Sequence, residues 1–303
     1  MQQKYCPPSL ILLLACIMTT AVHASEAKPT SPASNTFMWQ VKSTTASAYL
    51  LGTIYIAENK LLPMPPIIEK TFEKCTKVVI ESDVSKEETT SLARKMLVNA
   101  FYPEGDDIFQ HISRKLSDDV STAIAKYGMT AENIYRFRPW FLARTMTTNE
   151  LMLHGIDATQ GIDSYFVRKA KDNKAMLDLQ SVDESLDALF KWSDEDPERY
   201  IKRVLQETEV MSTRLDDIAA AWRRGDAKTV EDILHKPLKD NPKEFAEHFD
   251  RFFFQRNAEM TERLVEMLQT EDTYFVIVNA SFLIGEKGIL KLLERKKYEI
   301  VQM

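Results

Sequence analysis

Three short apolar segments of the chain end in residues that can form a chemical site. Residues 49–55 (YLLGTIY) and 275–282 (FVIVNASF) are β-branched runs that finish in small residues, which let a backbone turn sharply or approach a ligand closely. The third segment, residues 78–83 (VVIESD), ends in two carboxylates, Glu81 and Asp83. Such turns are where an α/β enzyme usually places its chemistry.

Glu81 has two interpretations. A charged group near the edge of a sheet needs a partner when it is buried, so an ion pair, with Arg256 as the candidate partner, is the first. A relic general base is the second. Both interpretations place Glu81 in a cleft.

The histidines do not form a recognisable metal motif. His111, His154, His235 and His248 are scattered, and no H-E-x-x-H pattern occurs. His235 and His248 lie in a helical segment rich in Lys, Asp and Glu, which predicts solvated surface. His154 precedes a glycine and can face the cleft. A rearranged metal site would draw on the carboxylates and the imidazole of Glu81, Asp83, His154 and Asp163.

The sequence does not predict a nucleophilic enzyme. Neither G-x-S-x-G nor a phosphate-binding loop is present. Cys75 lies between the helix-like residues 67–74 and a strand and has no histidine beside it, so we expect it to be a buried, small apolar residue. The aromatic run 252–254 is typical of core packing.

Composition excludes one class of function. The 303 residues are 44% hydrophobic, which is enough for a buried core, and the formal net charge is −6. A nucleic-acid-binding protein needs a concentrated basic face, so we expect no nucleic-acid partner.

The first residues carry the pattern of an export signal. Lys4 precedes the apolar run 10–18, and residues 22–24 (VHA) form a small-residue cleavage pattern. We therefore predict a signal peptide over 1–24, a polar linker over 25–36, and an exported protein that is periplasmic or secreted.

A lipoprotein signal is the alternative form of processing. In that case Cys16 would carry a lipid and anchor the protein to the envelope. No other stretch reaches the roughly 18 apolar residues of a membrane-spanning helix, so no transmembrane span is expected in the mature chain. After ordinary cleavage Cys75 would be the sole cysteine, which excludes an intrachain disulfide.

The order of predicted elements indicates the fold class. Strands and one helix in β-β-α-β order occupy residues 37–81, helical patterns fill most of 85–268, and a β-α-β unit over 274–301 closes the chain. We expect an α/β fold: a mixed central sheet built from N- and C-terminal strands, with a large helical layer or cap inserted between them. A single domain over 37–303 follows.

A series of short motifs runs along nearly the whole mature chain in a fixed order. They are residues 38–39 (MW), 49–54 (YLLGTI), 62–66 (LPMPP), 78–83 (VVIESD), 138–140 (RPW), 161–165 (GIDSY), 221–226 (AWRRGD), 256–260 (RNAEM), 276–283 (VIVNASFL) and Gly288. In this order and spacing the chain resembles the TraB/GumN family, whose relatives include the Tiki-type metalloproteases.

The resemblance implies where a site should lie. In the family two G-x-x-H turns bind a divalent metal, and the corresponding positions here hold Tyr55 and Phe282. The acidic residue after the third strand is retained as Glu81, and Arg256 is retained. A glutamate position holds Gln180 and a glutamine position holds Ser185. Neither a phenyl ring nor a protonated phenol supplies a usable metal ligand, so the resemblance supports the fold more than the catalysis.

These observations give the functional expectation. The chain should be an exported, non-catalytic relative of metal-dependent peptidases, without a cofactor, that binds a peptide or protein in the former active-site cleft. The lining of that cleft is expected from Gly52, Tyr55, Glu81, Asp83, Asn279, Ser281 and Phe282, with Arg256 beside them. Tyr55 would donate to Glu81, and Phe282 would fill the metal position. The alternatives are an active metal-dependent peptidase or hydrolase with a rearranged site, and a structural cell-envelope protein.

Overall fold

The computed structural model describes residues 35–54, 63–82, 89–156, 161–171 and 173–303. Residues Ser34–Met303 cluster into one compact unit. The predicted signal peptide and nearly all of the linker lie outside the described residues, as do two predicted site residues, Tyr55 and Asp83.

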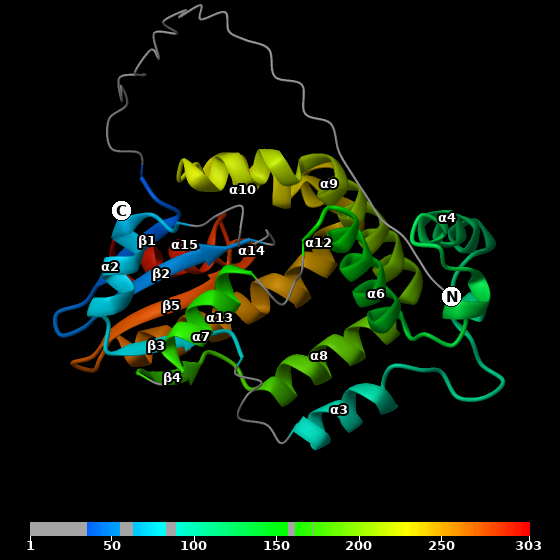
Figure 1. The fold of residues 1–303 in the computed structure, drawn as a ribbon, viewed down its shortest axis with the longest axis horizontal. Helices are drawn as coiled ribbons and strands as arrows, with labels where there is room; N and C mark the ends of the chain where they lie inside the picture. The colour runs from blue at the N-terminus through cyan, green and yellow to red at the C-terminus, as the bar shows by residue number, and fades with distance from the viewer. Residues whose placement is uncertain (1–34, 55–62, 83–88, 157–160, 172) are drawn as a thin grey trace, which may run out of the picture. The chain divides into compact units, whose positions relative to one another are not determined.

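Within the described residues, a six-stranded mixed sheet forms the centre of the fold (Figure 1). Its strands in spatial order are β4 (Ala175–Asp178), β3 (Lys77–Ile80), β5 (Thr273–Asn279), β2 (Ser47–Thr53), β1 (Met38–Lys42) and β6 (Glu299–Gln302). The pairs β4–β3, β3–β5 and β5–β2 are parallel, whereas β2–β1 and β1–β6 are antiparallel. The predicted sheet of N- and C-terminal strands is confirmed.

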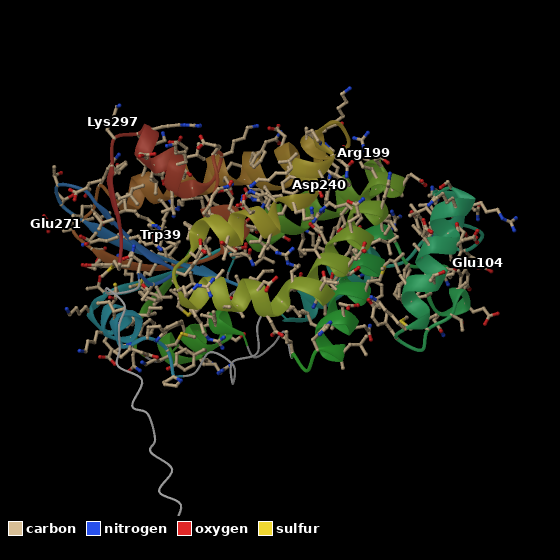
Figure 2. The ribbon with its side chains drawn as sticks, turned by 90° about the horizontal axis from the view of Figure 1, so that it is seen from above. Trp39, Glu104, Arg199, Asp240, Glu271 and Lys297 are labelled. Carbon is tan, nitrogen blue, oxygen red and sulfur yellow. The ribbon has the colours of Figure 1, made fainter. Side chains whose placement is uncertain are left out.

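Helices cover both faces of the sheet, which explains why β5 is a nearly continuous apolar run. One layer contains α2 (Pro66–Lys74) and α7 (Ile162–Ala170), and the other contains α13 (Gln255–Met267) and α15 (Ile289–Arg295). Figure 2 shows the blue strands between the cyan and green helices on one side and the orange and red helices on the other.

A cluster of three rings joins the first helical layer to the sheet. Phe72 of α2, Phe166 of α7 and Phe275 of β5 have ring centroids 5.1 to 5.3 Å apart. Aromatic pairs in such tilted and edge-on arrangements stabilise a core beyond the burial of their area. These contacts hold α7, which carries Asp163, against the central strand.

The predicted helical layer between the terminal strands is also confirmed, and it includes a second hydrophobic cluster. Its elements are α3 (Thr89–Val98), η2 (Ile108–Gln110), α4 (Arg114–Ala125), α5 (Ala131–Ile134), α6 (Pro139–Leu153), α8 (Val182–Glu195), α9 (Pro197–Arg223), α10 (Ala227–Leu234), α11 (Lys236–Asp240), α12 (Pro242–Phe249) and the π-helical turn η4 (Asp250–Phe254). No helix in the described ranges is long and apolar enough to cross a membrane.

The 27-residue helix α9 connects the two hydrophobic clusters. The buried residues Ile201 and Val204 near its start belong to the second cluster, whereas Ile218 and Trp222 near its end belong to the cluster around the sheet. The Trp222 Nε1 donates a 2.6 Å hydrogen bond to the carbonyl of Gly52 in β2. One helix therefore ties the inserted layer to the strand that ends at the expected site.

Gly52 packs against the core. A Cβ atom at this position would lie 2.7 Å from two atoms of the Phe37 ring and 3.0 Å from Leu283 Cδ2. Real Cβ contacts are almost never that short. The small residue is therefore required by the approach of an aromatic ring, and the proximity of a ligand is not needed to explain it.

We predict that Gly52→Ala destabilises the protein by about 1–3 kcal/mol, the usual cost of overpacking a core, because the Phe37 ring must move. Gly161→Ala is the matched control, since Gly161 has a φ of −82° and no atom of the described residues lies within 4 Å of an added Cβ. Urea unfolding measures both. A loss for Gly52→Ala no larger than that of the control would contradict the packing role.

Candidate functional site

The carboxyl ends of four parallel strands form one edge of the sheet. Thr53 at the end of β2 is in register with Asn279 at the end of β5. Ile80 at the end of β3 is in register with Asp178 in β4, and the Gln180 N–H donates to the Glu81 carbonyl at 2.9 Å. The segments that follow these strands therefore lie beside one another, although up to 226 residues separate them in the chain.

Glu81 is bonded to the segment that follows β5. Its Oε1 accepts a 2.7 Å hydrogen bond from the backbone N–H of Asn279. The Asn279 side chain in turn caps the short helix α14 (Ala280–Leu283), because its Oδ1 accepts from the Ser281 N–H at 3.0 Å and from the Ser281 Oγ at 2.7 Å. The carboxylate and the amide together fix the backbone of this turn.

Arg256 lies over the ring of Phe282. The guanidinium Cζ is 4.7 Å from the ring centroid, within the range of a cation–π interaction. Arg256 Nε donates to Gln180 Oε1 at 2.8 Å, and Gln180 Nε2 donates to Glu259 Oε2 at 2.9 Å. Gln180 thus connects an arginine and a glutamate of the same helix, α13, to the end of β4.

Phe282 itself is buried. It is 5% exposed, and its ring centroid lies 5.3 Å from that of Phe253 in η4. This placement explains why an apolar residue occupies a turn that the sequence assigns to the site. The Phe282 ring packs beneath the ends of the strands.

Two further polar contacts complete the edge. The Thr53 hydroxyl donates to Asp163 Oδ1 at 2.8 Å, which joins the end of β2 to the first turn of α7. The hydroxyls of Ser82 and Ser185 are 3.1 Å apart. The structure therefore brings together Thr53, Glu81, Asp163, Gln180, Ser185, Arg256, Asn279, Ser281 and Phe282.

Burial dominates the electrostatics of this cluster. It raises the pKa of Glu81 above its usual range, against the opposing effects of the Asn279 N–H and of Arg256, and the nearby Asp163 carboxylate raises it further. Burial likewise lowers the pKa of Arg256. The mutual attraction of the two groups is thus smaller than the cost of removing them from water.

Asp163 also has a raised pKa, again chiefly through burial and against the hydrogen bond from Thr53. The residue nevertheless keeps an exposed surface although protein packs densely around its carboxylate. Water therefore screens part of its charge, and the rise is smaller than complete burial would produce.

Within the described residues, the donor set of this cluster does not fit a divalent metal. The second family position holds a phenyl ring that is covered by a guanidinium, and a positive charge 4.7 Å from that ring opposes a cation there. Among the residues that the structure describes, no group of three or more His, Cys, Asp or Glu side chains can hold a metal ion.

The remaining candidates lie elsewhere. His154 ends α6 and its Nε2 is 3.4 Å from Glu150, a buried carboxylate that also accepts from the Tyr127 hydroxyl at 2.6 Å and pairs with Lys126 at 2.5 Å. Cys75 is buried, and burial raises the pKa of its thiol to about 12, so a thiolate does not form at neutral pH.

The prediction of a solvated surface was wrong for His235, which is 6% exposed and ends α10 against the loop after α14. The residues three and four positions before His235 are Asp232 and Glu231, both charged, so helical spacing itself indicated a polar face. The burial of His235 comes from tertiary contacts with Phe249 and Gly285, which no local pattern in α10 signals. The side chain of His248 is outside the described part of the structure.

A mixed parallel sheet, an inserted helical layer and a polar cluster at the strand ends define the class of protein. A family model, the TraB/PrgY/gumN family, matches residues 37–302. The chain belongs to this family.

The comparisons add one distant relative. An uncharacterized protein of Treponema pallidum (strain Nichols) is 25% identical over 154 residues, which cover 50% of this chain and 45% of that protein. The matched region thus spans about half the length of the curated relative. No solved structure matches the chain.

We predict that Glu81→Gln changes stability at pH 7 by less than about 1 kcal/mol or raises it, whereas Glu81→Ala costs about 1–3 kcal/mol. The amide oxygen still accepts from the Asn279 N–H, and loss of the charge removes a burial cost; alanine leaves that N–H without its acceptor. Urea unfolding at pH 7 and pH 4 measures both variants.

The sign of the pH dependence follows from the raised pKa of Glu81. The folded state holds the Glu81 proton more tightly than the unfolded chain does. The contribution of Glu81 to the free energy of unfolding is therefore greatest below its unfolded pKa of about 4.3 and falls as pH rises through its folded pKa. The advantage of Glu81→Gln should therefore vanish at pH 4. Equal losses for the glutamine and alanine variants at pH 7 would show that the charge itself is required.

Proposed function

We propose that this chain is a non-catalytic member of the TraB/PrgY/gumN family that binds a peptide or a protein segment at the edge formed by the ends of β2, β5, β3 and β4. The observation that carries the proposal is the contact of Arg256 with Phe282. Phe282 occupies the position that the family resemblance assigns to a metal ligand, and the Arg256 guanidinium covers its ring. The positive charge at this position is therefore supplied by a side chain of the protein and not by a metal ion.

The position of the cluster supports a binding role. In open α/β sheets ligands bind outside the carboxyl ends of the strands, and here Glu81, Asn279, Arg256 and Asp163 gather at such an edge. Carboxylates and a guanidinium together complement the N–H and C=O groups and the mixed charges of a peptide.

Export is part of the same proposal. It is supported by the apolar run 10–18 and the small-residue pattern 22–24. A periplasmic or secreted location, or anchoring through a lipid at Cys16, would give the chain access to envelope proteins and peptides.

A second candidate function is hydrolysis at a rearranged site. The raised pKa of Glu81 favours it, because a carboxyl group that keeps its proton nearer to neutral pH can act as a general acid. Asp163 would be its partner carboxylate. Cleavage products from a peptide library after incubation with the purified protein would establish this candidate in place of the first.

We expect Arg256→Ala to weaken binding of a fluorescently labelled peptide library by at least about tenfold, because a charge-assisted hydrogen bond is worth about 1.5–3 kcal/mol and tenfold corresponds to 1.4 kcal/mol. Arg263→Ala is the matched control on the same helix, where Arg263 is exposed and pairs with Glu266 at 2.6 Å. Fluorescence anisotropy measures both.

The control variant should bind like the wild type. Equal affinity of all three proteins would remove Arg256 from the proposed site. Absence of any binding by the wild type would favour the structural cell-envelope protein.

The next prediction concerns metal binding at Tyr55 and Phe282, the two positions where the resemblance places metal-binding histidines. Wild-type protein should bind zinc and cobalt negligibly, and each of Tyr55→His and Phe282→His alone should add little, since catalytic sites typically use three protein ligands. The double variant should gain measurable affinity, because two imidazoles then join Glu81.

Isothermal titration of the four proteins is the measurement. Stoichiometric metal in the wild type, with peptide cleavage abolished by a chelator, would overturn the non-catalytic proposal. Equal, negligible binding by the double variant would mean that the strand ends no longer have the family's geometry.

A further inference from the structure

A buried histidine supports the turn of the candidate site from outside the cluster. His235 ends α10, is 6% exposed, and its ring meets that of Phe249 edge-on at 5.7 Å. On another side it faces Gly285, whose φ is +95° and where an added Cβ would lie 3.0 Å from the ring Cε1. The imidazole therefore fills a tight space between α10 and the loop that follows α14.

The hydrogen bonding of the ring is incomplete. The backbone of Ser281 lies beside the ring and opposes the lowering of its pKa. Its Nε2 is buried and has no hydrogen-bond partner among the residues that the structure describes. In the neutral ring with its proton on Nδ1, Nε2 carries no hydrogen and needs no acceptor. Protonation would add an Nε2–H, and no hydrogen bond from a described residue would offset its desolvation.

The charged groups around the ring do not reverse this preference. Burial, the largest effect, lowers the pKa of His235, and Lys239 of α11 acts in the same direction. Glu231 and Asp232 of α10 oppose it, but both pair with Lys239, at 3.7 and 2.5 Å. On the facing loop, Glu286 pairs with Arg295 at 3.4 Å and Lys287 with Asp250 at 3.1 Å.

The ring is connected to the candidate site along two routes. The Ser281 backbone beside it belongs to the turn capped by Asn279, and Gly285, which the ring contacts, lies in the loop that follows. Through the rings, Phe249 stacks on Phe253 at 5.0 Å, and Phe253 contacts Phe282 at 5.3 Å. Displacement of His235 would therefore loosen both the backbone and the apolar floor of the site.

We propose that His235 is a pH-sensitive latch: the neutral imidazole holds the turn over residues 279–285 against α10, and its protonation releases that turn. The inference requires no ligand in the cleft, so it stands or fails separately from the proposed function.

The lowered pKa of His235 determines how release of the turn depends on pH. The folded state binds the proton of His235 more weakly than the unfolded chain, whose histidine pKa is about 6.5, so the latch is closed at neutral pH. As pH falls below that value, the opening equilibrium should shift by up to about tenfold per pH unit, the limit for one proton.

The experiment is hydrogen exchange of the full chain between pH 7.5 and 5, followed by mass spectrometry of peptides that cover residues 279–288. After correction for the pH dependence of chemical exchange, we expect exchange of the wild-type segment to increase by about three- to tenfold at the lower pH. His235→Gln should abolish this increase, because an amide does not titrate in this range.

His111→Gln is the matched control, since His111 is partly exposed and pairs with Asp106 at 2.7 Å. It should keep the wild-type pH response. An unchanged response in His235→Gln, or none in the wild type, overturns the proposal.

A proton NMR titration of the wild type keeps the test decisive even where His235→Gln does not fold. His235 should titrate below about 6.5, with the midpoint at which exchange of the turn increases. Titration at or above that value, or at a midpoint unrelated to exchange, also overturns the latch.

Discussion

The parallel pairing of β2 with β5 is the interaction on which the rest of the structure depends. Seven residue pairs, from Ser47–Thr273 to Thr53–Asn279, join the two ends of the chain in the middle of the sheet. The cost of closing so long a loop grows only slowly with its length, so a large helical insertion between the strands is tolerated. The pairing brings Thr53 level with Asn279 and thereby creates the site edge.

Beside this strand pair, three charged side chains lie where burial disfavours their charged forms. Burial opposes the charge on Glu81, Asp163 and Arg256. They are held by hydrogen bonds from the Asn279 backbone, from Thr53 and to Gln180. Costly polar groups at the ends of buried strands are more typical of a functional site than of a purely structural edge.

The inserted helices act on this edge through two supports. Trp222 at the end of α9 holds the carbonyl of Gly52, one residue before the end of β2. His235 at the end of α10 packs against Gly285 in the loop that follows α14. Both supports come from helix ends that pack on the sheet cluster, so changes in the inserted layer reach the site through short, buried contacts.

The sequence alone determined the strands, the helical middle and the mixed α/β class, because apolar runs and turn residues are local signals. It also indicated Glu81, Arg256, Asn279 and Phe282 as candidate site residues, since each belongs to a motif with recognisable spacing. Tertiary structure decided which neighbours those residues have. That Gly52 lies beneath Phe37, that Gln180 links Arg256 to Glu259, and that His235 is buried all depend on contacts between segments far apart in the chain. No local pattern encodes such contacts, because burial is a property of the packed fold and not of the residues beside a side chain in sequence.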